Sequence, residues 1–262
     1  MNAGHTRYTV ASGIPALKEA ICADYFARFG LEYKPSQIVV SNGAKHSLHN
    51  AFFCTLNPGD EAILPAPYWV SYAELIKLSG AVPVIVPTRE EDDFKLTPEA
   101  LRAAITPKTR MLLLCSPSNP TGSCYTRDEL EALADIAIEN DLFVVSDEIY
   151  ERLVYDGAPF ASFPTLREGL ADRTIVINGV SKTYAMTGWR VGWTFAPENV
   201  AKKMASTSER LLASRNRRTR AASANTPRWP PLPAIKVAST RCASSSKNAA
   251  ITSPVASPKF RE

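Results

Sequence analysis

Short runs of Val, Ile and Leu alternate with longer stretches of helical apolar spacing along most of the chain. Such runs are typical of buried strands, and the amphipathic stretches between them are typical of helices that cover a sheet. The alternation predicts an α/β fold with a seven-stranded, mostly parallel sheet flanked by helices. The predicted strands cover residues 38–40, 62–64, 82–86, 111–115, 143–145, 174–177 and 191–195. The predicted helices cover residues 14–29, 45–56, 69–79, 98–104, 127–140 and 197–212.

Two of the predicted helices begin with recognisable capping signals. Thr97 precedes Pro98, and proline is favoured at the first position of a helix. Thr126 stands three residues before Glu129, which is the spacing of a capping box. These signals predict helix starts at residues 98 and 127.

Polar and aromatic residues follow five of the predicted strands. The segments are "SNGAKHSL", "PAPYWVSY", "SPSNPTG", "SDEIYE" and "NGVSKTYAMTGWR". Ligands of open α/β sheets bind in the crevice outside the carboxyl ends of the strands. We therefore expect a site at this edge, with groups suited to a planar, anionic cofactor.

The composition is that of an ordinary globular protein. The chain has 262 residues, of which 45% are hydrophobic and 21% charged, enough for one large domain or two small ones. It has no apolar run of membrane-spanning length, and its start lacks the order of a signal peptide, so we expect a cytoplasmic protein with no membrane partner. The five scattered cysteines predict reduced thiols, and we expect no metal.

Charge divides the chain into two parts. Residues 207–262 hold 11 Lys and Arg against 2 Asp and Glu, a net charge of +9. Residues 1–206 hold 19 against 24, a net charge of −5. The basic part has no glycine, is rich in Ser, Ala, Arg and Pro, and shows no sustained period after about residue 216, so it is expected to be disordered.

Lys182 follows a predicted strand, and a lone lysine there is usually solvated. Six segments in order argue for more than solvation: "YTVASGIPALKEAI", "NGAKHSLHNAF", "PAPYWVSYAEL", "SPSNPTG", "SDEIYE" and "SKTYAMTGWRVGW". Together they resemble the class I aminotransferases, which are fold type I pyridoxal phosphate enzymes, in the branch of the bacterial aspartate aminotransferases. The resemblance runs from about Tyr8 to Ser206. It implies transfer of an amino group between an amino acid and a 2-oxoacid, most closely aspartate and 2-oxoglutarate.

The resemblance implies three catalytic residues. Lys182 matches the lysine whose amine bonds the aldehyde of pyridoxal 5'-phosphate and later moves the substrate proton. Asp147 matches the carboxylate that keeps the ring nitrogen protonated, so that the ring can act as an electron sink. Tyr150, the third, matches a donor to the ring 3' oxygen, and Asn119 matches the second donor, as a cofactor-binding residue. Glu148 is expected to point away from the site, as a supporting or a surface group.

Further residues are implied to bind the cofactor. Trp69 matches the aromatic residue that stacks on the ring. The segment "NGAK" opens a helix whose N-terminus suits a phosphate. Arg190 matches an arginine whose planar guanidinium can contact two phosphate oxygens. Tyr8 matches a tyrosine that reaches the phosphate of the neighbouring subunit, which implies a homodimer. The implied cofactor-binding residues besides Lys182, Asp147, Tyr150 and Asn119 are Trp69, Gly43, Ala44, Lys45, Arg190, Ser181 and Tyr8.

The two ends depart from the family pattern. Residues 1–206 are expected to form the cofactor-binding large domain, with an incomplete N-terminal arm. Residues 207–262 are expected to be a basic tail that replaces the small C-terminal domain, and no arginine in it matches the one that grips the substrate carboxylate. We attribute this tail to an out-of-frame or rearranged end of the coding sequence. Activity of the chain is then expected to be impaired.

Other functions stay open on the sequence. The same scaffold serves carbon–sulfur lyases and related fold type I enzymes, although "PYWVSY" and "YAMTGWRVG" favour transamination. A non-catalytic remnant is a second alternative. A binding protein that holds nucleic acid through its basic tail is a third, but the tail has no amphipathic basic helix and few stacking aromatic residues, so we expect no nucleic-acid partner.

Overall fold

The computed structural model describes residues 9–158 and 160–219, with side chains up to Glu209. Its strands are β1 Ile38–Ser41, β2 Glu61–Ala66, β3 Val82–Pro87, β4 Thr109–Cys115, β5 Phe143–Asp147, β6 Thr174–Gly179 and β7 Gly192–Phe195. Its α-helices are α1 Pro15–Phe29, α2 Ala44–Thr55, α3 Ser71–Leu78, α4 Pro98–Ala104, α5 Arg127–Glu139 and α6 Glu198–Thr219. Short 3-10 helices lie at Pro35–Gln37, Glu90–Asp92, Phe163–Thr165, Leu170–Arg173 and Thr187–Trp189.

The seven strands form one sheet in the order β1-β7-β6-β5-β4-β2-β3. Strands β3, β2, β4, β5 and β6 pair in parallel, whereas β7 is antiparallel to both of its neighbours, β6 and β1. The predicted seven-stranded, mostly parallel sheet is therefore confirmed. Because β7 runs against β6, the connection between them leaves and re-enters the sheet at one edge.

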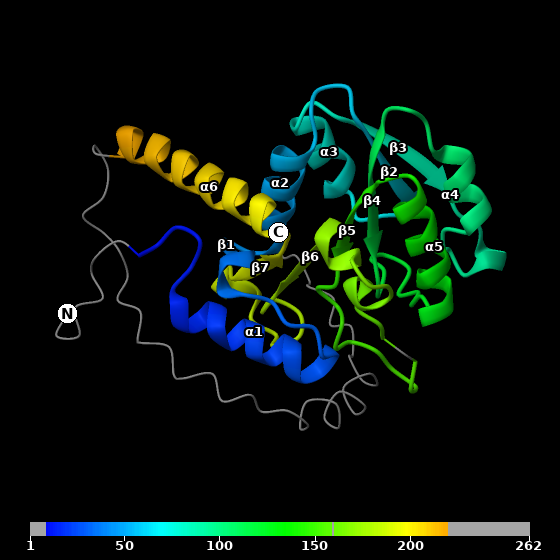
Figure 1. Ribbon diagram of the computed structural model, residues 1–262, viewed down its shortest axis with the longest axis horizontal. Coiled ribbons are helices and arrows are strands. Elements are labelled where there is room, and N and C mark those ends of the chain that lie inside the picture. The colour runs from blue at the N-terminus through cyan, green and yellow to red at the C-terminus, as the bar shows by residue number, and fades with distance from the viewer. Residues whose placement is uncertain (1–8, 159, 220–262) are drawn as a thin grey trace, which may run out of the picture. The chain divides into compact units, whose positions relative to one another are not determined.

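Helices cover both faces of the sheet (Figure 1). On one face, α2, α3 and α6 pack on strand residues that include Met111 and Leu113. On the other face, α4 and α5 pack on the alternate residues Leu112 and Leu114, and α1 packs on Val176 of β6. Strand β4 is thus buried on both sides, which is why its sequence is a continuous apolar run rather than an alternating one.

The two capping predictions are confirmed. The Thr97 side chain accepts a hydrogen bond from the backbone N–H of Ala100 at the start of α4. Thr126 and Glu129 form the reciprocal capping box of α5. An N-cap of this kind contributes about 1 kcal/mol to stability.

Helix α6 crosses the boundary predicted at residue 206. It continues to Thr219, beyond the expected end at residue 212. The side chain of Asn50 on α2 donates a hydrogen bond to Ser208 at 3.1 Å, and Cys54 lies 3.4 Å from the hydroxyl of Thr207. The first residues after the family resemblance therefore pack on the sheet-bearing unit. In the described ranges, no helix combines the length and apolarity that crossing a membrane requires.

Candidate functional site

The topology brings several polar segments to one edge of the sheet. Strands β1, β5 and β6 all end there, and β7 begins there because it is antiparallel to its neighbours. The connection after β6 therefore places Lys182 near its start and Arg190 near its end at this same edge. Helix α2 also begins here, directly after β1.

A pocket of about 220 Å³ opens at this edge. Nine of the eleven predicted site residues line it: Ala44, Lys45, Trp69, Asn119, Asp147, Tyr150, Ser181, Lys182 and Arg190. Gly43 lies beside it, against the guanidinium of Arg190. Tyr8 lies outside the described residues, so the structure says nothing about its place.

Asp147 is the last residue of β5 and is 3% exposed. Its Oδ2 accepts a hydrogen bond from the hydroxyl of Tyr72 at 2.7 Å, and its Oδ1 accepts one from the backbone N–H of Ile149 at 3.2 Å. Burial raises the pKa of Asp147 to about 6, although both hydrogen bonds act to lower it. The carboxyl group is therefore mostly ionised at neutral pH.

The N-terminus of α2 and Arg190 together form a cationic corner. Gly43 caps the helix with a φ of 82°, in a region that favours glycine. A Cβ atom at Gly43 would lie 2.3 Å from Nη2 of Arg190, so a side chain there would displace the guanidinium. Free backbone N–H groups, the helix dipole and the guanidinium all favour an anion at this corner.

The amine of Lys182 lies near Tyr150 in the same pocket. Its Nζ is 5.3 Å from the ring centroid of Tyr150. The side-chain amide of Asn119 donates a hydrogen bond to the hydroxyl of Tyr150 at 3.3 Å. The Nζ of Lys45 lies 4.8 Å from the centroid of the Trp69 ring, which is a cation–π contact. An amine, two neutral donors and an aromatic face thus share one small cavity.

Glu148 points away from the pocket, as expected, but it is not a surface group. It is 1% exposed. Its carboxyl group accepts hydrogen bonds from the hydroxyl of Ser146 at 2.9 Å, the hydroxyl of Ser162 at 2.7 Å and the backbone N–H of Phe163 at 3.0 Å. Burial raises its pKa to about 8. The 160–163 segment packs over this side of β5, which single-sequence reasoning does not reveal.

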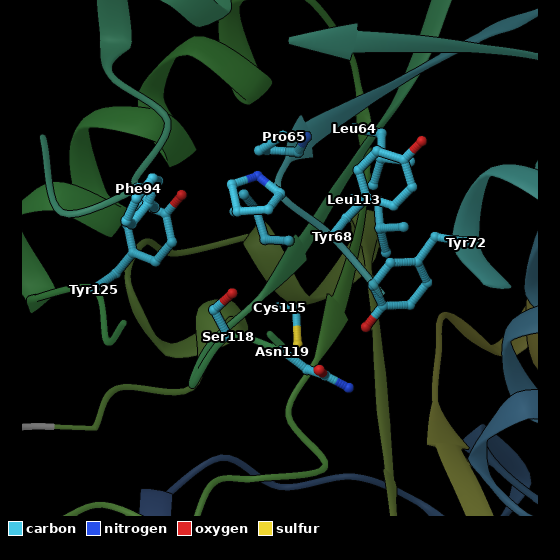
Figure 2. Close-up of a pocket in the computed structure, with 12 residues that line it drawn as sticks. Leu64, Pro65, Tyr68, Tyr72, Phe94, Leu113, Cys115, Ser118, Asn119 and Tyr125 are labelled. Carbon is cyan, nitrogen blue, oxygen red and sulfur yellow. The ribbon is translucent and has the colours of Figure 1, made fainter. Parts of the chain in front are cut away.

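Tyr72 is a site residue that sequence reasoning missed. It lines the 220 Å³ pocket and hydrogen-bonds Asp147. It also lines a second pocket of about 30 Å³ (Figure 2), and the linings of the two pockets share Tyr72 and Asn119. The available signal was its place in the segment "PAPYWVSY", three residues after Trp69.

Together, the sheet and its pocket define an α/β domain that gathers an amine, a guanidinium and a buried carboxylate at the carboxyl ends of its strands. Comparison with known protein families identifies the family to which this α/β domain belongs. The profile of the family "Aminotransferase class I and II" matches residues 1–262, and the chain belongs to that family.

Individual relatives agree with this assignment. The chain is 49% identical over 204 residues to aspartate aminotransferase of Geobacillus stearothermophilus, a match that covers 78% of this chain and 52% of the relative. The crystal structure of the aspartate aminotransferase of Rhizobium meliloti superposes with a TM-score of 0.78 at 41% identity, over 80% of this chain and 52% of the other. The aromatic aminotransferase of Pyrococcus horikoshii superposes with a TM-score of 0.78 at 40% identity, over 80% of this chain and 57% of the other. The chain thus spans about half the length of these relatives.

Proposed function

We propose that this chain binds pyridoxal 5'-phosphate and carries the amino-group transfer machinery of an aminotransferase. The observation that supports this most directly is the meeting of Lys182, Asp147 and Arg190 around one pocket. The three side chains come from β5 and from both ends of the β6–β7 connection. Amine, carboxylate and guanidinium are the groups that an aldehyde, a protonated ring nitrogen and a phosphate require.

The residues present fit this cofactor. Because Gly43 has no side chain, the guanidinium of Arg190 can lie against it, and an anion there would meet both the guanidinium and the N-terminus of α2. We propose that Gly43, Ala44, Lys45 and Arg190 hold the phosphate, with Ser181 beside them. We further propose that Trp69 covers the ring and that Asn119 and Tyr150 donate to its 3' oxygen.

The bound cofactor would supply an electron sink for the carbanion that forms when a substrate loses its α-proton. The chain's own residues would hold and move the protons. Lys182 would bind the cofactor covalently and then carry the proton as a free amine. Asp147, ionised above about pH 6, would hold a proton on the ring nitrogen. Tyr150 and Asn119 would set the acidity of the neighbouring nitrogen through their hydrogen bonds.

We propose an amino acid and a 2-oxoacid as substrates, with aspartate and 2-oxoglutarate as the first pair to test. The support is the similarity to two proteins named aspartate aminotransferase. The similarity to an aromatic aminotransferase keeps aromatic amino acids as the second group to test. We assign no residue to the grip on the substrate α-carboxylate.

Domain organisation and assembly are also proposals. We propose that residues 1–206 form the cofactor-binding domain, that residues 207–262 form a separate basic segment, and that the chain forms a homodimer. The charge change near residue 206 supports the division, but helix α6 runs across this position and Ser208 contacts α2, so the separate segment would begin beyond these contacts. Analytical ultracentrifugation of the full chain would test the dimer, and a single monomeric species at micromolar concentration would contradict it.

The experiment for the activity itself measures oxaloacetate formed from L-aspartate by the full chain with pyridoxal phosphate and 2-oxoglutarate. The Lys182→Ala variant is the control. We expect turnover by the wild type that the variant lacks. Equal rates in the two proteins would mean that Lys182 does not carry the reaction.

A further inference from the structure

Tyr72 contacts two residues of the proposed cofactor site at once. It is the second residue of α3 and is 2% exposed. Its ring meets the ring of Trp69 edge to face, with centroids 5.3 Å apart and planes at 86°. Its hydroxyl donates a hydrogen bond to Oδ2 of Asp147 at 2.7 Å. The aromatic ring and the hydroxyl therefore act on different partners.

Asp147 has few other donors. Among the described residues, Tyr72 is the one side chain that donates a hydrogen bond to its carboxyl group, and the remaining donor is the backbone N–H of Ile149. A buried carboxylate is stabilised mainly by such donors, because it has lost its water. Burial and the nearby Asp147 raise the pKa of Tyr72 well above its ordinary value, so the hydroxyl stays protonated and able to donate.

The other side of Tyr72 faces the small second pocket. Figure 2 shows its hydroxyl on the side of Cys115 and Asn119, with Leu64 and Leu113 among the surrounding side chains. Burial raises the pKa of Cys115 to about 12, so this thiol stays neutral. The second pocket has a volume of about 30 Å³, and most of the side chains that line it are apolar or aromatic.

We propose that Tyr72 is a positioning residue whose hydroxyl keeps Asp147 ionised and oriented toward the pocket, while its ring fixes the indole of Trp69. The consequence for cofactor binding rests on the function proposed above. The hydrogen bond and its effect on Asp147 do not, because they concern the chain alone.

The charges around Asp147 determine the expected pH effect. Lys182 and Arg190 from the β6–β7 connection and Lys45 from α2 line the same pocket. Tyr72 faces Asp147 from α3, and Cys115 faces it from β4. Replacing Tyr72 by Phe changes none of these charges and keeps the ring against Trp69. The donor to Asp147 is lost, together with the contact between the hydroxyl and the neutral Cys115 thiol, so we expect the pKa of Asp147 to rise.

The test is a titration of Asp147 in the full chain without cofactor. The protein is labelled with carbon-13 at the aspartate side-chain carboxyl, and the Asp147→Asn variant identifies its resonance. We expect the wild-type midpoint near pH 6. We expect Tyr72→Phe to raise it by about one pH unit, the effect of one hydrogen bond to a charged group.

Tyr125→Phe is the matched control. Tyr125 is also buried, also lines the second pocket, and uses its hydroxyl to accept a hydrogen bond from the backbone N–H of Leu96. The Tyr125→Phe substitution should leave the midpoint of the Asp147 titration unchanged. An unchanged midpoint in Tyr72→Phe, or an equal rise in Tyr125→Phe, would overturn the proposal. If Tyr72→Phe does not fold, the proposal is tested in the wild type alone. The chemical shift of the Tyr72 ring Cζ must then change with pH at the same midpoint as the Asp147 carboxyl group.

The same variants are then titrated with pyridoxal phosphate. Binding by the wild type should weaken as Asp147 becomes protonated, and in Tyr72→Phe this loss should begin about one pH unit higher. Absence of binding by the wild type would refute the proposed function, whereas the carboxyl titration would still decide the role of Tyr72. A raised carboxyl midpoint without a shift in the binding profile would reject the link between Tyr72 and the cofactor.

Discussion

Glu148 makes the stability of this fold depend on pH in a direction that can be calculated. Its ordinary pKa of 4.5 rises to about 8 in the native state, chiefly because burial disfavours the charged form. Between these values the native state keeps a proton that the unfolded chain has lost. The free energy of unfolding therefore falls as pH rises, by about 1.4 kcal/mol per pH unit in this window. This contribution is fully present below pH 4.5 and is lost as pH rises through about 8.

The substitution Glu148→Gln removes the titration but keeps a side chain of the same length for the Ser162 and Phe163 contacts. Between pH 6 and pH 7.5 we expect the wild type to lose about 2 kcal/mol more stability than the variant. Urea unfolding at a series of pH values measures both curves, and changes in Asp147 cancel in the comparison. The exposed Glu168→Gln is the control and should follow the wild type. Parallel curves for the wild type and Glu148→Gln would show that Glu148 is already ionised in the native state at pH 6, which would refute the reasoning.

Two further predictions concern single contacts. Gly192→Ala should lower the free energy of unfolding by about 1–3 kcal/mol, because its Cβ atom would lie 2.4 Å from the backbone nitrogen of Ala44. Gly188→Ala, where no atom lies within 4 Å of the added Cβ, should cost much less in the same urea experiment, and equal losses would contradict this account. Thr126→Ala should lower stability by about 1 kcal/mol through loss of the α5 capping box, as measured by the urea midpoint, whereas an unchanged midpoint would show that the box contributes nothing.

Local signals sufficed for most elements but not for their arrangement. The apolar runs located all seven strands, and the threonine caps located the starts of α4 and α5. The antiparallel direction of β7 depends on pairing between residues far apart, such as Val176 with Phe195, which no local pattern encodes. The helix predicted from residue 69 begins at Ser71, because the chain before it forms a loop that carries Trp69 to the pocket.

Some residues of the candidate site could be predicted from the sequence, and others could be found only from the fold. Family motifs named nine of the residues that line the pocket, and the fold brings their segments to one edge. They did not name Tyr72, because its importance comes from a contact between α3 and β5 that joins residues distant in sequence. The burial of Glu148 was equally hidden, since it depends on Ser162 and Phe163 packing over β5.

The central claim is that Lys182, Asp147 and Arg190 form one site for pyridoxal phosphate. The most direct test incubates the full chain with the cofactor, reduces it with borohydride and maps the modified peptide by mass spectrometry, beside Lys182→Ala as a control. We predict one modified residue, Lys182, together with an absorbance band near the visible edge that the variant lacks. Modification spread over several surface lysines, or a band that persists in Lys182→Ala, would contradict the account.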